Sequence, residues 1–262
     1  MNLGMKSLAQ DKKNVAAMTN DDGWWESIKT VLYAVILAVV IRTLVFEPFS
    51  IPSKSMVPTL LVGDYLIVTK YSYGYSRYSL PFSLPLFEGR WRESAPARGD
   101  VVVFKLPRDN RTDYIKRVIG LPGDEIQVKK GILYVNGKSV TRAKLPEYVD
   151  DDGRGGENKF NQYRETLPDP QKNHLILEKS DDEKLDNTPL YKIPEGHYFM
   201  MGDNRDNSMD SRVESMVGFV PAENLIGKAQ YVFFSVGSNT AWWQIWNWPS
   251  SIRFDRLLVK IE

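Results

Sequence analysis

Hydrophobic and polar positions divide the chain into one long apolar segment near the N-terminus and a region of short apolar runs after it. The long segment covers residues 28–46 and contains the unbroken apolar run Val31–Ile41. As a helix rising about 1.5 Å per residue it would span roughly 28 Å, close to the roughly 30 Å thickness of the bilayer hydrocarbon. The pattern therefore predicts a single transmembrane helix over 28–46.

The charges that flank this segment predict its orientation. Lysines lie on its N-terminal side, at positions 6, 12, 13 and 29, whereas Lys54 is the only basic residue in the twenty that follow Phe46. Because basic residues stay on the cytoplasmic side, residues 1–27 are expected in the cytoplasm and everything after the span outside the cytoplasmic (inner) membrane. A cleaved secretory signal remains an alternative, since Ser53 and Ser55 have the small-x-small spacing of a cleavage site. The long polar stretch before the apolar run favours a retained anchor.

After Ser55 the pattern changes to short β-branched and aromatic runs separated by turn residues. The runs are Tyr65–Val68, Val101–Phe104, Glu125–Val128, Ile132–Val135 and Tyr198–Met201. Such spacing favours antiparallel strands in a sandwich or barrel. Asn136 and Gly137 predict a type I′ hairpin turn. The fold class we expect is mainly β: a membrane helix followed by an antiparallel all-β domain over 47–262.

Two regions of the expected β domain differ in composition. Residues 143–187 are highly charged and contain few β runs, so we expect a solvated polar insertion there. Residues 241–249 contain four tryptophans, which suit either a core or a patch at the membrane interface.

Composition limits the chemistry. A formal charge of +1 and no broad basic region argue against nucleic acid as a partner. With no cysteine and only His174 and His197, there is little material for a thiolate, a metal site or a Ser-His pair.

Serine chemistry without histidine requires another base. The chain has no Gly-x-Ser-x-Gly motif, and Pro58 stands where a Ser-x-x-Lys motif starting at Ser55 would need lysine. Lys54 is a poor base for Ser55, because adjacent side chains in an extended segment point to opposite faces. Lys116 lies in the mostly apolar stretch 113–120, where burial could lower its pKa from about 10.4 toward the 7 to 8 of a general base. Spacing alone does not single it out, since a lone lysine on a strand is usually a surface charge.

Four segments in order resemble the motifs of bacterial type I signal peptidases, also called leader peptidases. They are Phe49–Leu60, Arg98–Phe104, Tyr114–Asp124 and Gly202–Arg212. The resemblance implies a membrane-bound serine endopeptidase with a Ser-Lys dyad, which removes signal peptides from exported preproteins at the lipid bilayer without metal or cofactor.

The resemblance also implies a role for each matching residue. Ser55 would be the nucleophile and Lys116 the general base. The Ser55 N–H and the Ser53 hydroxyl would form the oxyanion hole. Ser208 would orient the lysine amine, and Asp210, Arg212 and Asp203 would support the site.

Two pockets are expected to accept small side chains at the first and third positions before the scissile bond. The first pocket is assigned Ile51, Pro52, Met56, Leu60, Tyr114 and Ile115. The third is assigned Phe49, Leu66, Val103 and Ile115. Lys54 stands where the family commonly has glycine and would add charge at the rim.

Two alternatives remain open at this stage. One is a Ser-Lys peptidase dedicated to a narrow substrate, such as a pilin or conjugation precursor. The other is an inactive, membrane-tethered β domain that binds exported chains.

Overall fold

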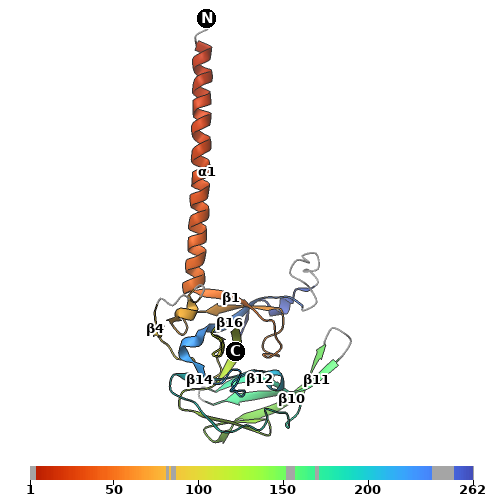
Figure 1. Cartoon of the computed structure of the whole chain (residues 1–262). Coiled ribbons are helices and arrows are strands. Elements are labelled where there is room, and N and C mark those ends of the chain that lie inside the picture. The colour runs from red at the N-terminus through yellow and green to blue at the C-terminus, as the bar shows by residue number, and fades with distance from the viewer. Residues whose placement is uncertain are drawn as a thin grey trace. The chain divides into compact units, whose positions relative to one another are not determined.

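The structure is a computed structural model in which two compact units, residues 1–44 and 45–262, are each described by themselves (Figure 1). It describes residues 4–80, 83, 87–151, 157–168, 171–237 and 251–261, with the side chains of 4–22, 151 and 157 excepted. The tryptophan-rich stretch 241–249 lies outside these residues.

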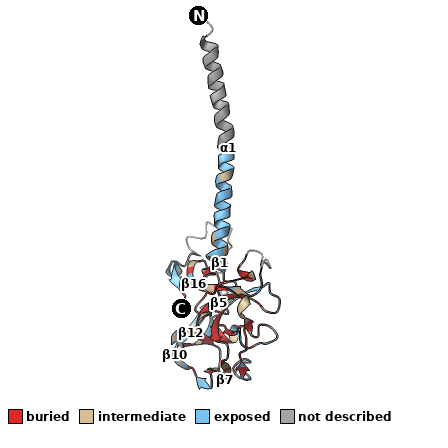
Figure 2. Ribbon diagram, turned by 90° about the vertical axis from the view of Figure 1, so that its left-hand side faces the viewer, coloured by how far each residue is buried: buried red, intermediate tan, exposed pale blue. Residues whose placement is uncertain are grey.

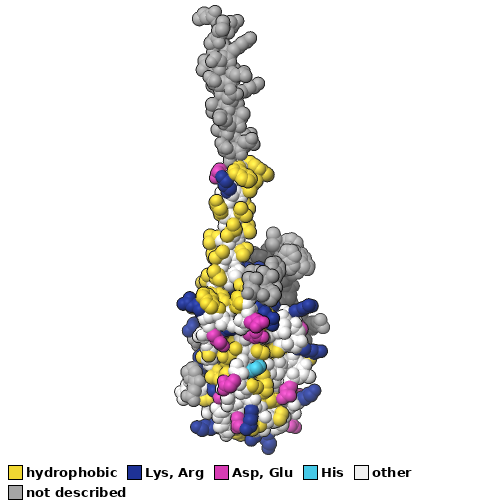
Figure 3. Space-filling view, turned by 60° about the vertical axis from the view of Figure 1, so that its left-hand side comes forward, with side chains coloured by type: hydrophobic (Ala, Val, Ile, Leu, Met, Phe, Trp, Pro, Cys, Tyr) yellow, Lys and Arg dark blue, Asp and Glu magenta, His cyan; other side chains and the backbone are white. Residues whose placement is uncertain are grey.

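The first unit is one long helix, α1 (Gly4–Leu44). Its stretch Gly23–Leu44 is apolar and long enough to cross a membrane. Apart from the half-buried Ile41, the described large apolar side chains of this stretch are exposed, as the blue ribbon of Figure 2 and the yellow side chains of Figure 3 show. Apolar side chains without a protein partner are typical of a helix that faces lipid.

The helix ends before the predicted boundary. The predicted segment ran to Phe46, but α1 ends at Leu44 and Phe46 begins the first strand. Pro48 accounts for the difference, because proline disfavours helical backbone at the residue before it and cannot donate a helical hydrogen bond.

The second unit is built on an antiparallel sheet that contains three of the predicted strands. Its order is β1 (Phe46–Ser50), β2 (Asp64–Thr69), β16 (Leu225–Ser235), β5 (Val101–Lys105), β6 (Asp113–Gly120), β14 (His197–Met201) and β15 (Val220–Pro221), with β17 (Val259–Lys260) beside β16. The mainly β, antiparallel fold class is thus confirmed. Strand β1 pairs only with β2 among the described strands, so one of its edges is free.

Smaller sheets complete the unit. One joins β13 (Tyr191–Lys192), β7 (Glu125–Lys129), β8 (Ile132–Val135) and β9 (Lys138–Ser139), and another joins β3 (Tyr75–Ser76) and β4 (Arg90–Trp91). Short 3-10 helices are η1 (Arg77–Ser79), η3 (Arg205–Asn207), η4 (Ala222–Asn224) and η6 (Phe254–Arg256). The predicted hairpin turn is present between β8 and β9, where Asn136 and Gly137 have φ of 53° and 76°, as a type I′ turn requires.

Residues 143–187 differ most from expectation. Instead of a solvated insertion they form most of a three-stranded sheet, here called the third sheet: β10 (Thr141–Asp151), β11 (Glu157–Leu167) and β12 (Lys172–Glu178). Its buried residues are Phe160, Tyr163, Leu167, Ile176 and Leu177, together with the charged or polar Glu165, His174 and Glu178. The composition was misleading because several of its charges are buried and paired inside the protein instead of facing water.

Candidate active site

Ser55 and Lys116, distant in sequence, meet in the β unit. Ser55 lies in the turn that follows β1, and Lys116 lies on β6, opposite Val102 of β5. Lys116 Nζ is 2.6 Å from Ser55 Oγ, and both residues are buried, with 4% and 8% of their surface exposed. A hydroxyl and an amine at this distance can exchange a proton directly.

The surroundings of Lys116 favour the neutral amine. Burial is the largest influence on the pKa of Lys116 and lowers it. The carboxylates of Asp210 and Asp203 raise this pKa, Arg212 lowers it, and the resulting value is about 8. The same amine also donates to the Ile115 carbonyl at 3.0 Å. A pKa near neutrality leaves a useful fraction of the lysine able to accept a proton.

The expected oxyanion donors flank the nucleophile. Ser53 Oγ lies 3.4 Å from Ser55 Oγ. The Ser55 N–H donates to no other group in the described part of the chain, so it is available to a substrate oxygen. Leu60 N donates to the Met56 carbonyl and Val57 N to that of Lys54, which gives the nucleophile's turn its shape.

The segment 202–212, here called the catalytic loop, surrounds the lysine. Asp210 and Arg212 form the ion pair that the resemblance implies, with Nε and Oδ1 2.9 Å apart, and Asp210 also accepts from the Gly202 N–H at 3.0 Å. Ser208 is buried beside them. Its Oγ lies beside the Asp210 carboxylate and makes no hydrogen bond to Lys116, so its expected orienting role stays a prediction.

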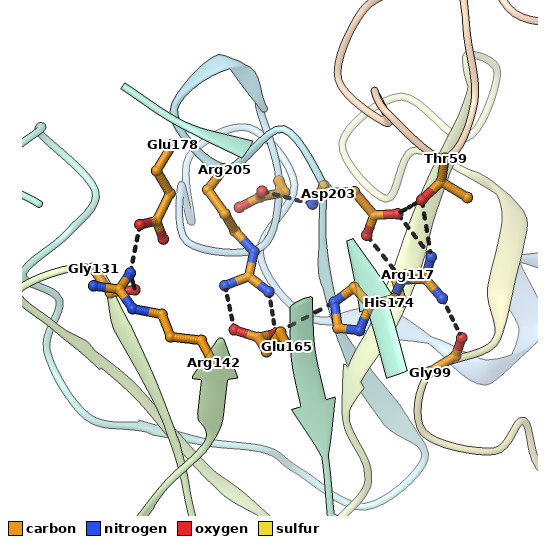
Figure 4. A network of polar contacts seen from close by, with 12 residues as sticks. Thr59, Gly99, Arg117, Gly131, Arg142, Glu165, His174, Glu178, Asp203 and Arg205 are labelled. Carbon is orange, nitrogen blue, oxygen red and sulfur yellow. Dashed lines mark hydrogen bonds and ion pairs between the residues drawn. The ribbon is translucent and has the colours of Figure 1, made fainter. Parts of the chain in front are cut away.

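Asp203 binds the residue next to the lysine. Its carboxylate accepts from Arg117 at 2.8 and 2.7 Å and from Thr59 Oγ1 at 2.6 Å (Figure 4). Arg117 and Asp203 are each 1% exposed. Sequence reasoning missed Arg117 and Thr59, although both lie inside recognised motifs. The signal in the sequence was their opposite charge: Arg117 lies in the third of the four motifs and Asp203 in the fourth, which made an ion pair between them possible.

A cleft of about 420 Å³ opens beside the dyad. It is lined by residues 49–55 and 112–116 together with Val103, Asn207 and Met209. Six of the residues assigned to the substrate pockets line it: Phe49, Ile51, Pro52, Val103, Tyr114 and Ile115.

Three assigned pocket residues do not line the cleft. Met56, Leu60 and Leu66 are almost completely buried in the apolar cluster that also contains the cleft residues Ile51 and Val103. They lie one layer deeper, because their side chains point into the core. Conversely, Ser50, Thr112, Asp113, Asn207 and Met209 line the cleft and were not predicted, although all but Thr112 are adjacent to a predicted site residue.

Two strand edges at this cleft are free of other described strands. One is the edge of β1, and the other belongs to residues 113–116 of β6, because β14 pairs with β6 only from Arg117 onward. Free edges offer backbone N–H and C=O groups to an extended peptide.

The remaining charges near the site are structural. Lys54 is not directed to Ser55, because its amine pairs with Asp150 of β10 at 2.7 Å.

Across the described residues, no group of three or more His, Asp or Glu side chains could hold a metal ion.

Comparison with known proteins gives consistent matches. The family model for "Signal peptidase, peptidase S26" matches residues 24–234. A signal peptidase I from Rickettsia canadensis (strain McKiel) is 41% identical over 265 aligned positions, covering 94% of this chain and 96% of that protein. A signal peptidase I from Rickettsia typhi (strain ATCC VR-144 / Wilmington) is 42% identical over 247, covering 87% and 90%. Among solved structures, a signal peptidase I from Enterococcus faecalis V583 matches at 26% identity and a TM-score of 0.30, covering 52% of this chain and 97% of that one.

Proposed function

Because the chain belongs to the signal peptidase family, peptidase S26, we propose that it cleaves signal peptides from preproteins by a Ser55–Lys116 dyad. The observation that carries the assignment of these two residues is the 2.6 Å separation of Lys116 Nζ and Ser55 Oγ in a buried site. Serine peptidase activity on signal peptides follows from the family; the role of each residue is our inference.

The reaction begins with neutral Lys116. Its amine takes the Ser55 Oγ proton as Oγ attacks the carbonyl carbon before the scissile bond. The resulting oxyanion accepts hydrogen bonds from the Ser55 N–H and the Ser53 hydroxyl. As the peptide bond breaks, the Lys116 ammonium gives its proton to the leaving amine, which becomes the N-terminus of the mature protein.

The second half repeats these steps with water. The signal peptide remains joined to Ser55 Oγ as an ester, and Lys116 is neutral again. It removes a proton from the attacking water and then returns it to Ser55 Oγ when the ester breaks. The signal peptide leaves as a carboxylic acid, which loses its proton to solvent, and Ser55 and neutral Lys116 are restored.

An extended substrate fits between the free edges of β1 and β6. Backbone hydrogen bonds to these edges would supply affinity without reading sequence. Ile51, Val103 and Ile115 lie on the cleft wall and pack against the buried core, which limits the depth available to a substrate side chain. Small residues at the first and third positions before the cut are therefore preferred.

The apolar helix fits a membrane-anchored protein. We assign residues 1–27 to the cytoplasm and the β unit to the outer face of the cytoplasmic membrane, on the basis of the lysines before the span. Protease added to intact spheroplasts should digest the β unit and spare an epitope at the N-terminus. Digestion of the epitope without digestion of the β unit would indicate the opposite orientation.

The dyad is tested with the purified full-length protein in detergent and a model preprotein. Ser55→Ala and Lys116→Ala should each abolish cleavage while keeping the fold. The matched controls Ser139→Ala and Lys192→Ala remove an exposed serine and an exposed lysine and should cleave normally. Full activity of both dyad variants would refute the assignment.

A dedicated peptidase with one narrow substrate is not favoured, because the curated relatives are signal peptidases I. Cleavage of several unrelated preproteins would agree with this choice.

A further inference from the structure

The third sheet is joined to the catalytic loop by backbone and side-chain contacts. Leu177 N of β12 donates to the Asp203 carbonyl at 2.9 Å, and Leu177 forms a parallel bridge with Asn204. Lys179 N donates to Asp206 Oδ2 at 2.6 Å. The sheet therefore borders the same segment that surrounds Lys116.

That segment in turn holds both halves of the dyad. Asn204 N donates to the Ser55 carbonyl at 3.1 Å, and Asn204 Nδ2 donates to the Lys54 carbonyl at 3.0 Å. Asp203 binds Arg117, the neighbour of Lys116 on β6. A displacement of residues 203–204 would thus move the backbone of the nucleophile relative to that of the base.

The side chain that anchors this segment comes from the third sheet. Arg205, fully buried, makes two hydrogen bonds to Glu165 of β11, one of them from Nη1 to Oε1 at 3.0 Å (Figure 4). His174 Nε2 of β12 lies 3.3 Å from Glu165 Oε2. The Arg205 carbonyl also accepts from Arg212 Nη2 at 2.5 Å, which links the anchor to the Asp210–Arg212 ion pair.

The Glu165 carboxylate is charged under assay conditions. Burial raises its pKa, but Arg205 and His174 outweigh burial and lower the pKa to about 2. A bidentate carboxylate–guanidinium pair fixes both distance and orientation. Removing Glu165 leaves the buried Arg205 without its hydrogen-bonded carboxylate, although the charges of Glu178 and Asp203 remain nearby. The guanidinium must then move or become hydrated.

We propose that Glu165 is a positioning residue for signal-peptide cleavage. Through Arg205 it fixes the catalytic loop, and through the loop it fixes the distance between Ser55 and Lys116. This inference rests on the proposed Ser55–Lys116 dyad. It gives the charged region 143–187 a part in the reaction, although Glu165 itself touches neither the dyad nor the cleft.

The test uses the full-length protein, a model preprotein, and Glu165→Gln, which removes the charge and keeps the shape. Because a shift of about 1 Å at reacting groups can cost up to about a hundredfold, kcat should fall between about tenfold and a hundredfold. KM should change less than kcat, because among the cleft residues only Asn207 and Met209 belong to the catalytic loop. The midpoint of the acidic limb of the pH profile should move above about 8, because water that reaches Lys116 relieves the burial that lowers its pKa.

A matched control separates positioning from stability. Asp124 is a buried carboxylate bound to Arg98 at 2.8 Å, outside the catalytic loop. Asp124→Asn should lower the melting temperature but leave kcat and the pH midpoint unchanged. Glu165→Asp, which retains the charge, should have a kcat and a pH midpoint between those of wild type and of Glu165→Gln.

A double-mutant cycle tests whether Glu165 acts through Arg205. If it does, Glu165→Gln combined with Arg205→Gln should lose no more kcat than the worse single variant. Additive losses would overturn the inference, as would a folded Glu165→Gln protein with wild-type kcat and pH midpoint. If Glu165→Gln does not fold, kcat and the pH midpoint of Glu165→Asp decide instead. A change in both quantities supports the inference, and wild-type values of both refute it. A wrong assignment of the Ser55–Lys116 dyad would be distinguished from a wrong role for Glu165, because Ser55→Ala would then remain active.

Discussion

At the residue scale, Lys116 experiences two opposing influences. Its buried position disfavours the ammonium, whereas the carboxylates of Asp210 and Asp203 favour it. Arg212 and Arg117 pair with these carboxylates and so reduce their effect on the lysine. The buried ion pairs beside the dyad thereby help to keep the pKa of Lys116 low, which increases the fraction of neutral amine near physiological pH.

The pKa of Lys116 predicts the pH dependence of cleavage. Only the neutral amine accepts the serine proton, so kcat/KM should fall about tenfold for each pH unit below the midpoint of about 8 and level off above it. Initial rates on a model preprotein from about pH 5 to about pH 10 would measure this profile. A flat profile through the acidic half would contradict a neutral lysine base.

Ser53→Ala should reduce kcat by about a hundredfold to a thousandfold, because an oxyanion donor acts mainly on the transition state. KM should stay close to the wild-type value. Ser53→Thr keeps a hydroxyl and should lose much less. Steady-state kinetics of the three proteins would measure the difference, and equal kcat values for wild type and Ser53→Ala would remove Ser53 from the oxyanion hole.

At the element scale, the site depends on where strand β1 ends and on which part of β6 has no neighbouring strand. Strand β1 runs into the turn that carries Ser55, and β6 carries Lys116 on the part of the strand that β14 leaves unpaired. The two strands therefore supply the reacting groups and the edges for the substrate together. The third sheet reinforces this arrangement through the catalytic loop.

Ile115 on β6 is expected to limit the size of the substrate side chain. It lines the cleft and packs against the apolar cluster beneath. Ile115→Ala should raise the relative kcat/KM for a preprotein with leucine in place of alanine at the third position before the cut. Since each methylene in an apolar pocket is worth about 1–3 kcal/mol, the gain should be roughly tenfold or more.

The control for this change is Ile132→Ala on β8, which also shortens a half-buried isoleucine but lies outside the cleft. It should leave the leucine-to-alanine preference as in wild type. If Ile115→Ala also left the preference unchanged, Ile115 would not be a determinant of specificity.

At the scale of the whole molecule, the chain consists of an apolar helix and a β unit that form separate compact units. The described dyad, cleft and catalytic loop all belong to the β unit. The residues proposed for catalysis and the apolar helix therefore lie in different compact units of the chain.

A protein consisting of residues 45–262 should fold and cleave a short soluble signal-peptide substrate with kcat/KM within about threefold of the full-length enzyme. On a preprotein inserted in vesicles the full-length enzyme should be faster, since sharing a membrane raises the effective concentration of the substrate. Parallel assays on both substrates would measure this. An unfolded or inactive fragment would show that the β unit needs the helix.

Local signals in the sequence determined much of this protein. The apolar segment, the predicted strands, the Asn136–Gly137 turn and the ordered motifs around Ser55 and Lys116 depend on neighbouring residues, so they were predictable. Residues such as Met56, Leu60 and Leu66 were placed at the substrate because a motif gives proximity along the chain and not the direction of a side chain.

Tertiary structure alone decided the rest. It formed a sheet from the charged region 143–187, in which the buried Glu165 is neutralised by Arg205, 40 positions away in sequence. It also brought Asn207 and Met209 to the cleft and Arg117 to Asp203. Composition records how many charges a segment carries, but only the folded chain determines which charges meet, and therefore which can be buried.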